Sequence, residues 1–106
     1  MNTLTPRDKY LRKEYGITEA EYMKMLKVQD GKCALCGQVP KPTTNLHVDH
    51  EHVLGYQRMP PEERRKYVRG LLDYRCNKFK LGRTTLSDAR RIFEYLENPP
   101  ARRVLK

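Results

Sequence analysis

Two short motifs that are far apart in the chain place the strongest constraint on its fold. The first is CALCG at residues 33–37, which presents Cys33 and Cys36 in a spacing typical of a zinc half-site. A second half-site needs two further ligands with two residues between them, and Asp73 and Cys76 have that spacing. A redox-active CxxC pair is the competing interpretation, but no βαβ pattern surrounds the motif. We therefore expect a structural Zn²⁺ site that brings the two motifs together.

The composition indicates a small core and a polyanionic partner. The chain has 106 residues, of which 38% are hydrophobic, with no tryptophan and two phenylalanines. This length suits one domain with a thin core, so a metal ion that holds the fold together is expected. Lys and Arg number 22 against 13 Asp and Glu, which gives a formal net charge of +9. Such an excess of cationic side chains favours binding to the phosphates of a nucleic acid.

The sequence lacks the features of a membrane or secreted protein. No stretch is long and apolar enough to span a bilayer, and no basic amphipathic segment with bulky apolar residues stands out. The N-terminal segment 1–6 has no apolar core of the kind that signal peptides carry. We therefore expect a cytoplasmic protein without a membrane partner. Its three cysteines, an odd number, are then expected to be metal ligands and not disulfide partners.

Local sequence signals predict an α+β chain that is mostly helical. Thr5 and Pro6 favour a helix start, and Thr18 opens a capping-box pattern for a second helix. Ser87 is the expected N-cap of the last helix, whose core or interface role stays open. The expected helices span 6–15, about 18–29, a short segment opened by Pro61, 76–81 and about 87–96. The expected strand spans 46–53, and segment 68–72 leads into the helix at Cys76-Asn77.

Two smaller expectations concern packing and the insertion. On the second helix, the apolar side is expected to be formed by Tyr22, Met25, Leu26 and Val28. The polar segment 55–67 reads as a solvated insertion. The basic tail 101–106 is expected to fray.

All three histidines of the chain lie within six residues, at His47, His50 and His52. Asp49 and Glu51 alternate with them. Imidazole suits proton transfer near neutral pH, and carboxylate oxygens suit hard cations such as Mg²⁺. Together they supply the groups that phosphodiester hydrolysis needs. A polar surface strand, or a purely structural metal site, would produce the same pattern.

Three ordered motifs, CALCG, LHVDHEH and VRGLLDYRCN, resemble the phage recombination endonuclease VII family. This family belongs to the His-Me finger, or HNH-like, nucleases. The similarity extends over Tyr15 to Leu96 and includes the lead-in YGITEAEYMKMLKVQDGKC. It implies a ββα-metal core on a zinc knuckle, flanked by N- and C-terminal helices. The expected organisation is a single nuclease domain over 1–106: a helical lead-in (1–30), the knuckle and core (31–82), and a C-terminal helix with a basic tail (83–106).

The resemblance also implies a role for each site residue. Asp49 and Asn77 match ligands of a catalytic divalent ion, Mg²⁺ or Mn²⁺. His50 matches the general base that activates the attacking water. His47 and His52 match flanking histidines that assist in positioning metal or phosphate. No organic cofactor is implied.

The sequence departs from the family pattern at two places. Asp73 replaces the third zinc cysteine. Either three sulfurs and the Asp73 carboxylate hold the zinc, or three sulfurs and a water molecule hold it, or the site is weakened; we favour the carboxylate. Downstream of Asn77 the chain carries Lys78 and Lys80 in place of an acidic residue, so we expect phosphate oxygens and water to complete the metal shell.

Three functions follow from these motifs. The leading one is a metal-dependent endonuclease that hydrolyses branched DNA, similar to a Holliday junction resolvase and with a homodimer as its possible assembly. The alternatives are a sequence-specific HNH nicking or homing-type enzyme, and a non-catalytic, zinc-stabilised DNA-binding module. Arg69 would either contact the scissile phosphate or, as a surface residue, only add to the positive electrostatic potential.

Overall fold

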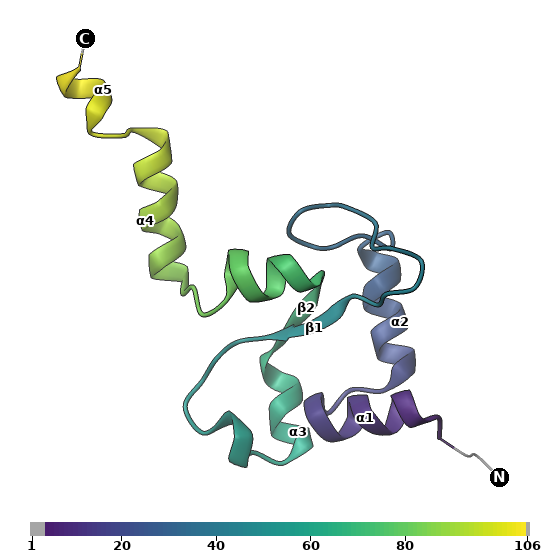
Figure 1. Cartoon of the computed structure of the whole chain (residues 1–106). Coiled ribbons are helices and arrows are strands. Elements are labelled where there is room, and N and C mark those ends of the chain that lie inside the picture. Colours follow the sequence, from purple (N-terminus) through teal and green to yellow (C-terminus); the bar gives the residue numbers. More distant parts are fainter. Residues whose placement is uncertain (1–3, 106) are drawn as a thin grey trace.

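The computed structural model describes residues 4–105, so expectations for residues 1–3 and 106 lie outside it. Helices dominate, and two strands form the sheet of the described part, which confirms the α+β class (Figure 1). The helical elements are α1 (Pro6–Tyr15), α2 (Glu19–Val28), η1 (Tyr56–Arg58), α3 (Pro61–Arg64), η2 (Arg65–Tyr67), η3 (Cys76–Leu81), α4 (Leu86–Glu97) and α5 (Ala101–Val104). The strands are β1 (His47–His50) and β2 (Val68–Leu72).

The first two helices begin and end where their capping residues predict. The Thr5 side chain accepts a hydrogen bond from the Asp8 backbone N–H, and Gly16 ends α1 with φ 71°. Thr18 and Glu21 form the expected capping box at the start of α2. The buried Asp8 carboxylate accepts from the Glu19 N–H at 2.8 Å, which ties the two helices together.

The strands β1 and β2 pair antiparallel, with His47 opposite Leu72 and Asp49 opposite Gly70. A register shift between Asp49 and His50 ends the regular ladder, although the Glu51 N–H still donates to the Tyr67 carbonyl at 2.8 Å. The predicted strand 46–53 was therefore too long. Its second half leaves the sheet because the opposing segment turns into η2, beyond the last backbone partner at Tyr67.

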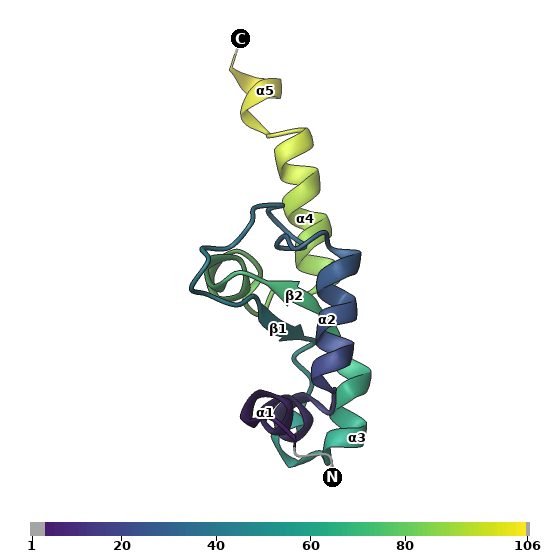
Figure 2. The same cartoon turned by 90° about the vertical axis from the view of Figure 1, so that its right-hand side faces the viewer.

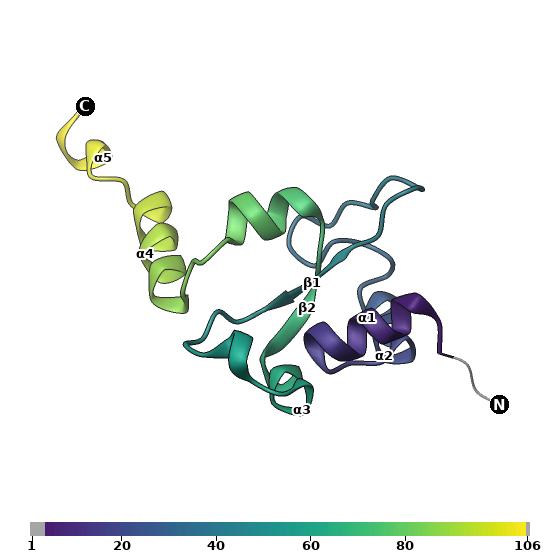
Figure 3. The same ribbon diagram turned by 60° about the horizontal axis from the view of Figure 1, so that its bottom comes forward.

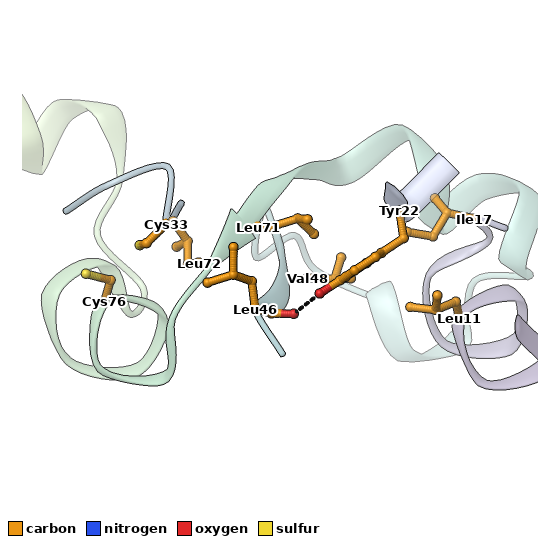
Figure 4. Close-up of a cluster of buried hydrophobic side chains, with 9 residues drawn as sticks. All are labelled: Leu11, Ile17, Tyr22, Cys33, Leu46, Val48, Leu71, Leu72 and Cys76. Atoms are coloured by element: carbon orange, nitrogen blue, oxygen red, sulfur yellow. Dashed lines mark hydrogen bonds between the residues drawn. The ribbon is translucent and has the colours of Figure 1, made fainter. Parts of the chain in front are cut away.

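The core runs from Leu11 and Tyr22, on α1 and α2, across the sheet to Cys33 and Cys76 (Figure 4). The Tyr22 hydroxyl donates to the Leu46 carbonyl at 2.6 Å, a buried bond that fixes α2 to the start of β1. Val28 was expected on the apolar side of α2, but this last residue of the helix is 84% exposed. The buried apolar side chains are Leu11, Ile17, Tyr22, Cys33, Leu46, Val48, Leu71, Leu72 and Cys76.

Most residues of the insertion 55–67 are exposed, as predicted, but the segment also docks on the C-terminal end of α1 (Figure 3). Arg64 Nη1 and the Tyr56 hydroxyl both donate to the Glu14 carbonyl, at 3.1 and 3.2 Å. Arg65 Nη1 donates to the Gly16 carbonyl at 2.9 Å. The last carbonyls of a helix lack partners within it, so they accept from these side chains. Gly16 permits the close approach, because a Cβ there would lie 1.9 Å from the Pro61 carbonyl oxygen.

The C-terminal helices project from the rest of the molecule (Figures 1 and 2), and the described structure as a whole measures 71 × 34 × 19 Å. The N-cap of α4 is Thr85 and not Ser87 as predicted, because Thr85 and Asp88 exchange capping-box hydrogen bonds at 3.0 and 3.2 Å. No residue of α4 is buried. The tail was expected to fray, but Ala101–Val104 form α5. Within residues 4–105, no helix is long and apolar enough to cross a lipid bilayer.

Candidate active site and metal centre

The two motifs predicted to bind zinc do come together. One ligand atom from each of Cys33, Cys36, Asp73 and Cys76 lies within 4.8 Å of all the others. The first turn is closed by the Gly37 N–H, which donates to the Cys33 carbonyl at 2.9 Å. β2 delivers the second motif, because it ends at Leu72 immediately before Asp73.

Local hydrogen bonds orient the Asp73 carboxylate toward the thiols. It accepts from the Cys76 backbone N–H at 2.7 Å, and the Cys36 Sγ lies 3.1 Å from its other oxygen. The Cys76 N–H and the Cys36 thiol lower the pKa of Asp73 to about 2. Burial and the nearby Asp73 raise the pKa of Cys76 to about 12.

These charges suit a metal ion. The cluster already holds one carboxylate, and the thiols of Cys36 and Cys76 resist further negative charge unless a cation supplies compensation. The pKa of Cys36 is likewise raised, by Asp73 above all. Three thiol sulfurs and one carboxylate oxygen are an acceptable tetrahedral donor set for Zn²⁺. The four residues therefore form a cluster that can hold a structural metal ion.

Asp49 is the buried carboxylate of the histidine segment, with 5% of its surface exposed. Arg69 binds it in a bidentate manner, with Nε 2.7 Å from Oδ2 and Nη2 3.1 Å from Oδ1. The same Nη2 donates to the His50 carbonyl at 3.2 Å. Arg69 therefore fixes the orientation of Asp49, a contact that neither sequence interpretation of Arg69 included.

His50 is held by an aromatic stack. Its ring lies against the Tyr56 ring, with centroids 4.0 Å apart and planes 13° apart. The Arg64 guanidinium covers the Tyr56 ring at 5.0 Å from its centroid. Burial, and then repulsion from His52, lower the pKa of His50 below its ordinary value. A neutral imidazole in a fixed orientation is suited to accept a proton at neutral pH.

One cleft of about 410 Å³ brings together all five residues predicted to be catalytic. The cleft lies between β1 and η3. The backbone of η3 is π-helical, as the hydrogen bond of 3.1 Å from the Gly82 N–H to the Asn77 carbonyl, five residues earlier, shows. Lys78 and Arg83 add positive charge at its wall. The lining residues are Tyr15, His47, Val48, Asp49, His50, His52, Tyr74, Asn77, Lys78, Gly82 and Arg83.

The sequence interpretation missed Tyr56, Tyr74 and Arg83. Tyr56 lies in the insertion that was predicted to be solvated, and its contact with His50 had no sequence signal. Tyr74 directly follows Asp73, so its position near the cleft could have been inferred from the pairing of the two motifs. In chemical terms, the cleft offers a carboxylate and an amide oxygen for a hard cation, an imidazole base, and cations for phosphate.

Comparisons with known proteins identify the family of the chain. A family model described as recombination endonuclease VII matches residues 8–98. The chain is 39% identical over 93 residues to the "Gene 59 protein" of Mycobacterium phage L5, and 37% identical over 93 residues to that of Mycobacterium phage D29. Each alignment covers 86% of this chain and 50% of the relative, so the chain spans about half the length of these curated relatives.

No solved structure matches the chain significantly. The family match spans the sheet, the cysteine cluster and the cleft, and it confirms the resemblance that the three sequence motifs indicated. The chain therefore belongs to the recombination endonuclease VII family of nucleases.

Proposed function

We propose that this chain is a divalent-metal-dependent DNA endonuclease whose active site is the cleft between β1 and η3. The observation that carries the proposal is the convergence of Asp49, His50 and Asn77 on that one cleft. The hairpin-like sheet followed by η3 supports a ββα-metal core of the His-Me finger type. The zinc cluster at the junction of β2 and η3 supports a single nuclease domain in which zinc holds this core together.

In this mechanism Asp49 and Asn77 would hold the catalytic ion, Mg²⁺ or Mn²⁺. When bound, such an ion stabilises the charge that develops on the phosphate and on the leaving oxygen. His50 removes a proton from the attacking water, and the Tyr56 ring keeps its imidazole oriented. The exposed His47 and His52 assist in positioning phosphate oxygens.

Lys78 and Arg83 attract the DNA backbone to the cleft, since positively charged side chains replace the counterions of phosphates. The net charge of +9 supports the same partner. We propose branched or junction DNA as the preferred substrate. Side chains of α4 that are 51% exposed or more support a homodimer through this helix: Leu86, Ile92, Phe93, Tyr95 and Leu96.

A second candidate function is a non-catalytic DNA-binding module stabilised by zinc. The bidentate Arg69–Asp49 pair favours it, because the guanidinium engages both oxygens of the carboxylate. This candidate predicts salt-sensitive DNA binding without cleavage in any divalent ion.

The deciding experiment compares cleavage of a four-way junction, a linear duplex and a plasmid in Mg²⁺ or Mn²⁺. We expect junction cleavage by the zinc-loaded protein and a loss of at least roughly 100-fold in His50→Ala, as for removal of a general base. Glu51→Ala is the matched control, because Glu51 is exposed and does not line the cleft. Equal cleavage by wild type and His50→Ala would sink the mechanism.

The same assay separates the remaining alternatives. No cleavage of any DNA in either metal would favour the binding module. Cuts at one recognition sequence, mapped by run-off sequencing, would favour a sequence-specific nicking enzyme over a structure-specific one. Sedimentation at micromolar protein would test the homodimer, and a Phe93→Glu variant would then be expected to be monomeric.

A further inference from the structure

Two aromatic side chains at the outer edge of the cleft are exposed. Phe79 is 71% exposed and Tyr74 is 52% exposed. Their rings meet edge to face, with centroids 6.1 Å apart and planes 84° apart. Lys78 Nζ lies 5.5 Å from the Tyr74 centroid and 5.8 Å from that of Phe79. A lysine thus lies over both rings of an exposed aromatic pair.

This pair is continuous with the proposed active site. The Tyr74 ring lies 6.0 Å from the ring of His47, and both Tyr74 and Lys78 line the catalytic cleft. Phe79 also lines a second hollow together with Arg75 and Lys80, next to the metal-cluster residues Cys36, Asp73 and Cys76. An aromatic row therefore runs outward from the cleft, with cationic side chains along it.

Exposed rings interleaved with cations are the features by which proteins bind unpaired nucleotides. A ring stacks on the face of a base regardless of its identity, while the cations follow the phosphates. In a continuous duplex the faces of each base are covered by its neighbours, so only edges are accessible in the grooves. Such a row consequently selects bases that have left the stack.

We propose that Tyr74, Lys78 and Phe79 form a stacking ridge for an unpaired nucleobase beside the phosphate in the cleft. This inference rests on the proposed nuclease function and deepens it, because it names the residues that hold an unpaired base next to the bond that is cut. Phe79 and Tyr74 supply the stacking surfaces. Lys78 neutralises the phosphate between the stacked base and the cleft.

The test measures binding alone, with the zinc-loaded full chain and no Mg²⁺ or Mn²⁺ added. The probes are a single-stranded oligonucleotide that contains 2-aminopurine and the intact duplex of the same sequence. Anisotropy reports affinity for each, and 2-aminopurine fluorescence reports stacking. We expect Phe79→Leu to lose roughly tenfold in single-strand affinity, within the range for loss of one stacked base, together with the fluorescence change. Its duplex affinity stays within about twofold.

Matched variants separate the ridge from general effects. Tyr10→Leu removes an aromatic ring of α1 that is 51% exposed and does not line the cleft, and should change neither signal. Phe79→Tyr keeps a stacking ring and should restore single-strand binding. Lys78→Met should reduce the salt dependence of single-strand binding by about one phosphate.

Three results would overturn the ridge: unchanged single-strand affinity in Phe79→Leu, an equal loss for single strand and duplex, or a change of oligomeric state in that variant, which would make Phe79 a protein contact. Failure of the proposed nuclease function is distinguishable from failure of the ridge. Absent cleavage with intact stacking refutes the nuclease alone, whereas cleavage with no stacking signal refutes the ridge alone.

Discussion

Replacing Gly16 by alanine should separate the insertion from α1 and destabilise the protein strongly. Gly16 has φ +71°, a conformation that costs an L-residue about 1–2 kcal/mol. In addition, the new Cβ would lie 1.9 Å from the carbonyl oxygen of Pro61 and 2.7 Å from its carbonyl carbon. These are backbone atoms, which cannot move aside as a flexible side chain can. The start of α3 must therefore withdraw from α1.

Withdrawal of α3 breaks the hydrogen bonds that dock the insertion. Tyr56 and Arg64 would lose the Glu14 carbonyl, and Arg65 would lose the carbonyl of Gly16. Each bond contributes about 0.5–1.5 kcal/mol net, so the total loss with the backbone strain is roughly 3–6 kcal/mol. That is a large part of the 5–15 kcal/mol, approximately, by which small domains are stable.

Gly31→Ala is the matched control. Gly31 has the same φ of +71°, but nothing lies within 4 Å of the position of its Cβ. It should lose only the strain of about 1–2 kcal/mol. The free energy of unfolding is measured for both variants by urea titration of the zinc-loaded protein, followed by circular dichroism. Equal losses in the two variants would refute the contact between α1 and α3, because the conformational strain alone would then explain both.

Three further predictions concern the metal cluster, the aromatic stack and one ion pair. Asp73→Ala should lower zinc affinity by at least roughly tenfold, measured by competition with a chromophoric chelator, and Asp73→Cys should raise it. Equal zinc affinities of the wild type and Asp73→Ala would favour a site of three sulfurs and a water molecule. Tyr56→Leu should slow junction cleavage by roughly 2- to 12-fold, because the His50 ring loses its stacking partner. Tyr56→Phe keeps the stack and should cleave like the wild type. Equal rates in the wild type and both variants would contradict a positioning role for Tyr56. The hydrogen bond from Arg65 lowers the pKa of Glu21 to about 2. The pair therefore stabilises the fold fully at pH values above the ordinary pKa of the carboxyl, and this stabilisation is lost as the pH falls through 2. In an NMR titration Arg65→Met should return the Glu21 pKa toward 4.5, and an unchanged midpoint would refute the pair.

The sequence alone determined the parts of the fold that depend on near neighbours in the chain. Thr5 and Gly16 bound α1 because a helix cap forms hydrogen bonds within about one turn. The same rule, applied to Thr85 and Asp88, would have corrected the N-cap that was assigned to Ser87. The cysteine spacing likewise identified the metal cluster, since each pair of ligands is arranged by its own short turn.

Only the tertiary structure decided how the candidate site is assembled. The insertion places Tyr56 against His50 because Arg64 and Arg65 donate hydrogen bonds to the last carbonyls of α1. The absence of a side chain at Gly16 leaves room for α3 to approach. The histidine cluster that dominated the sequence is therefore oriented by residues that no local pattern connects to it. Contacts of this kind depend on how close two parts of the surface lie after folding, and the separation of residues along the sequence does not encode that distance.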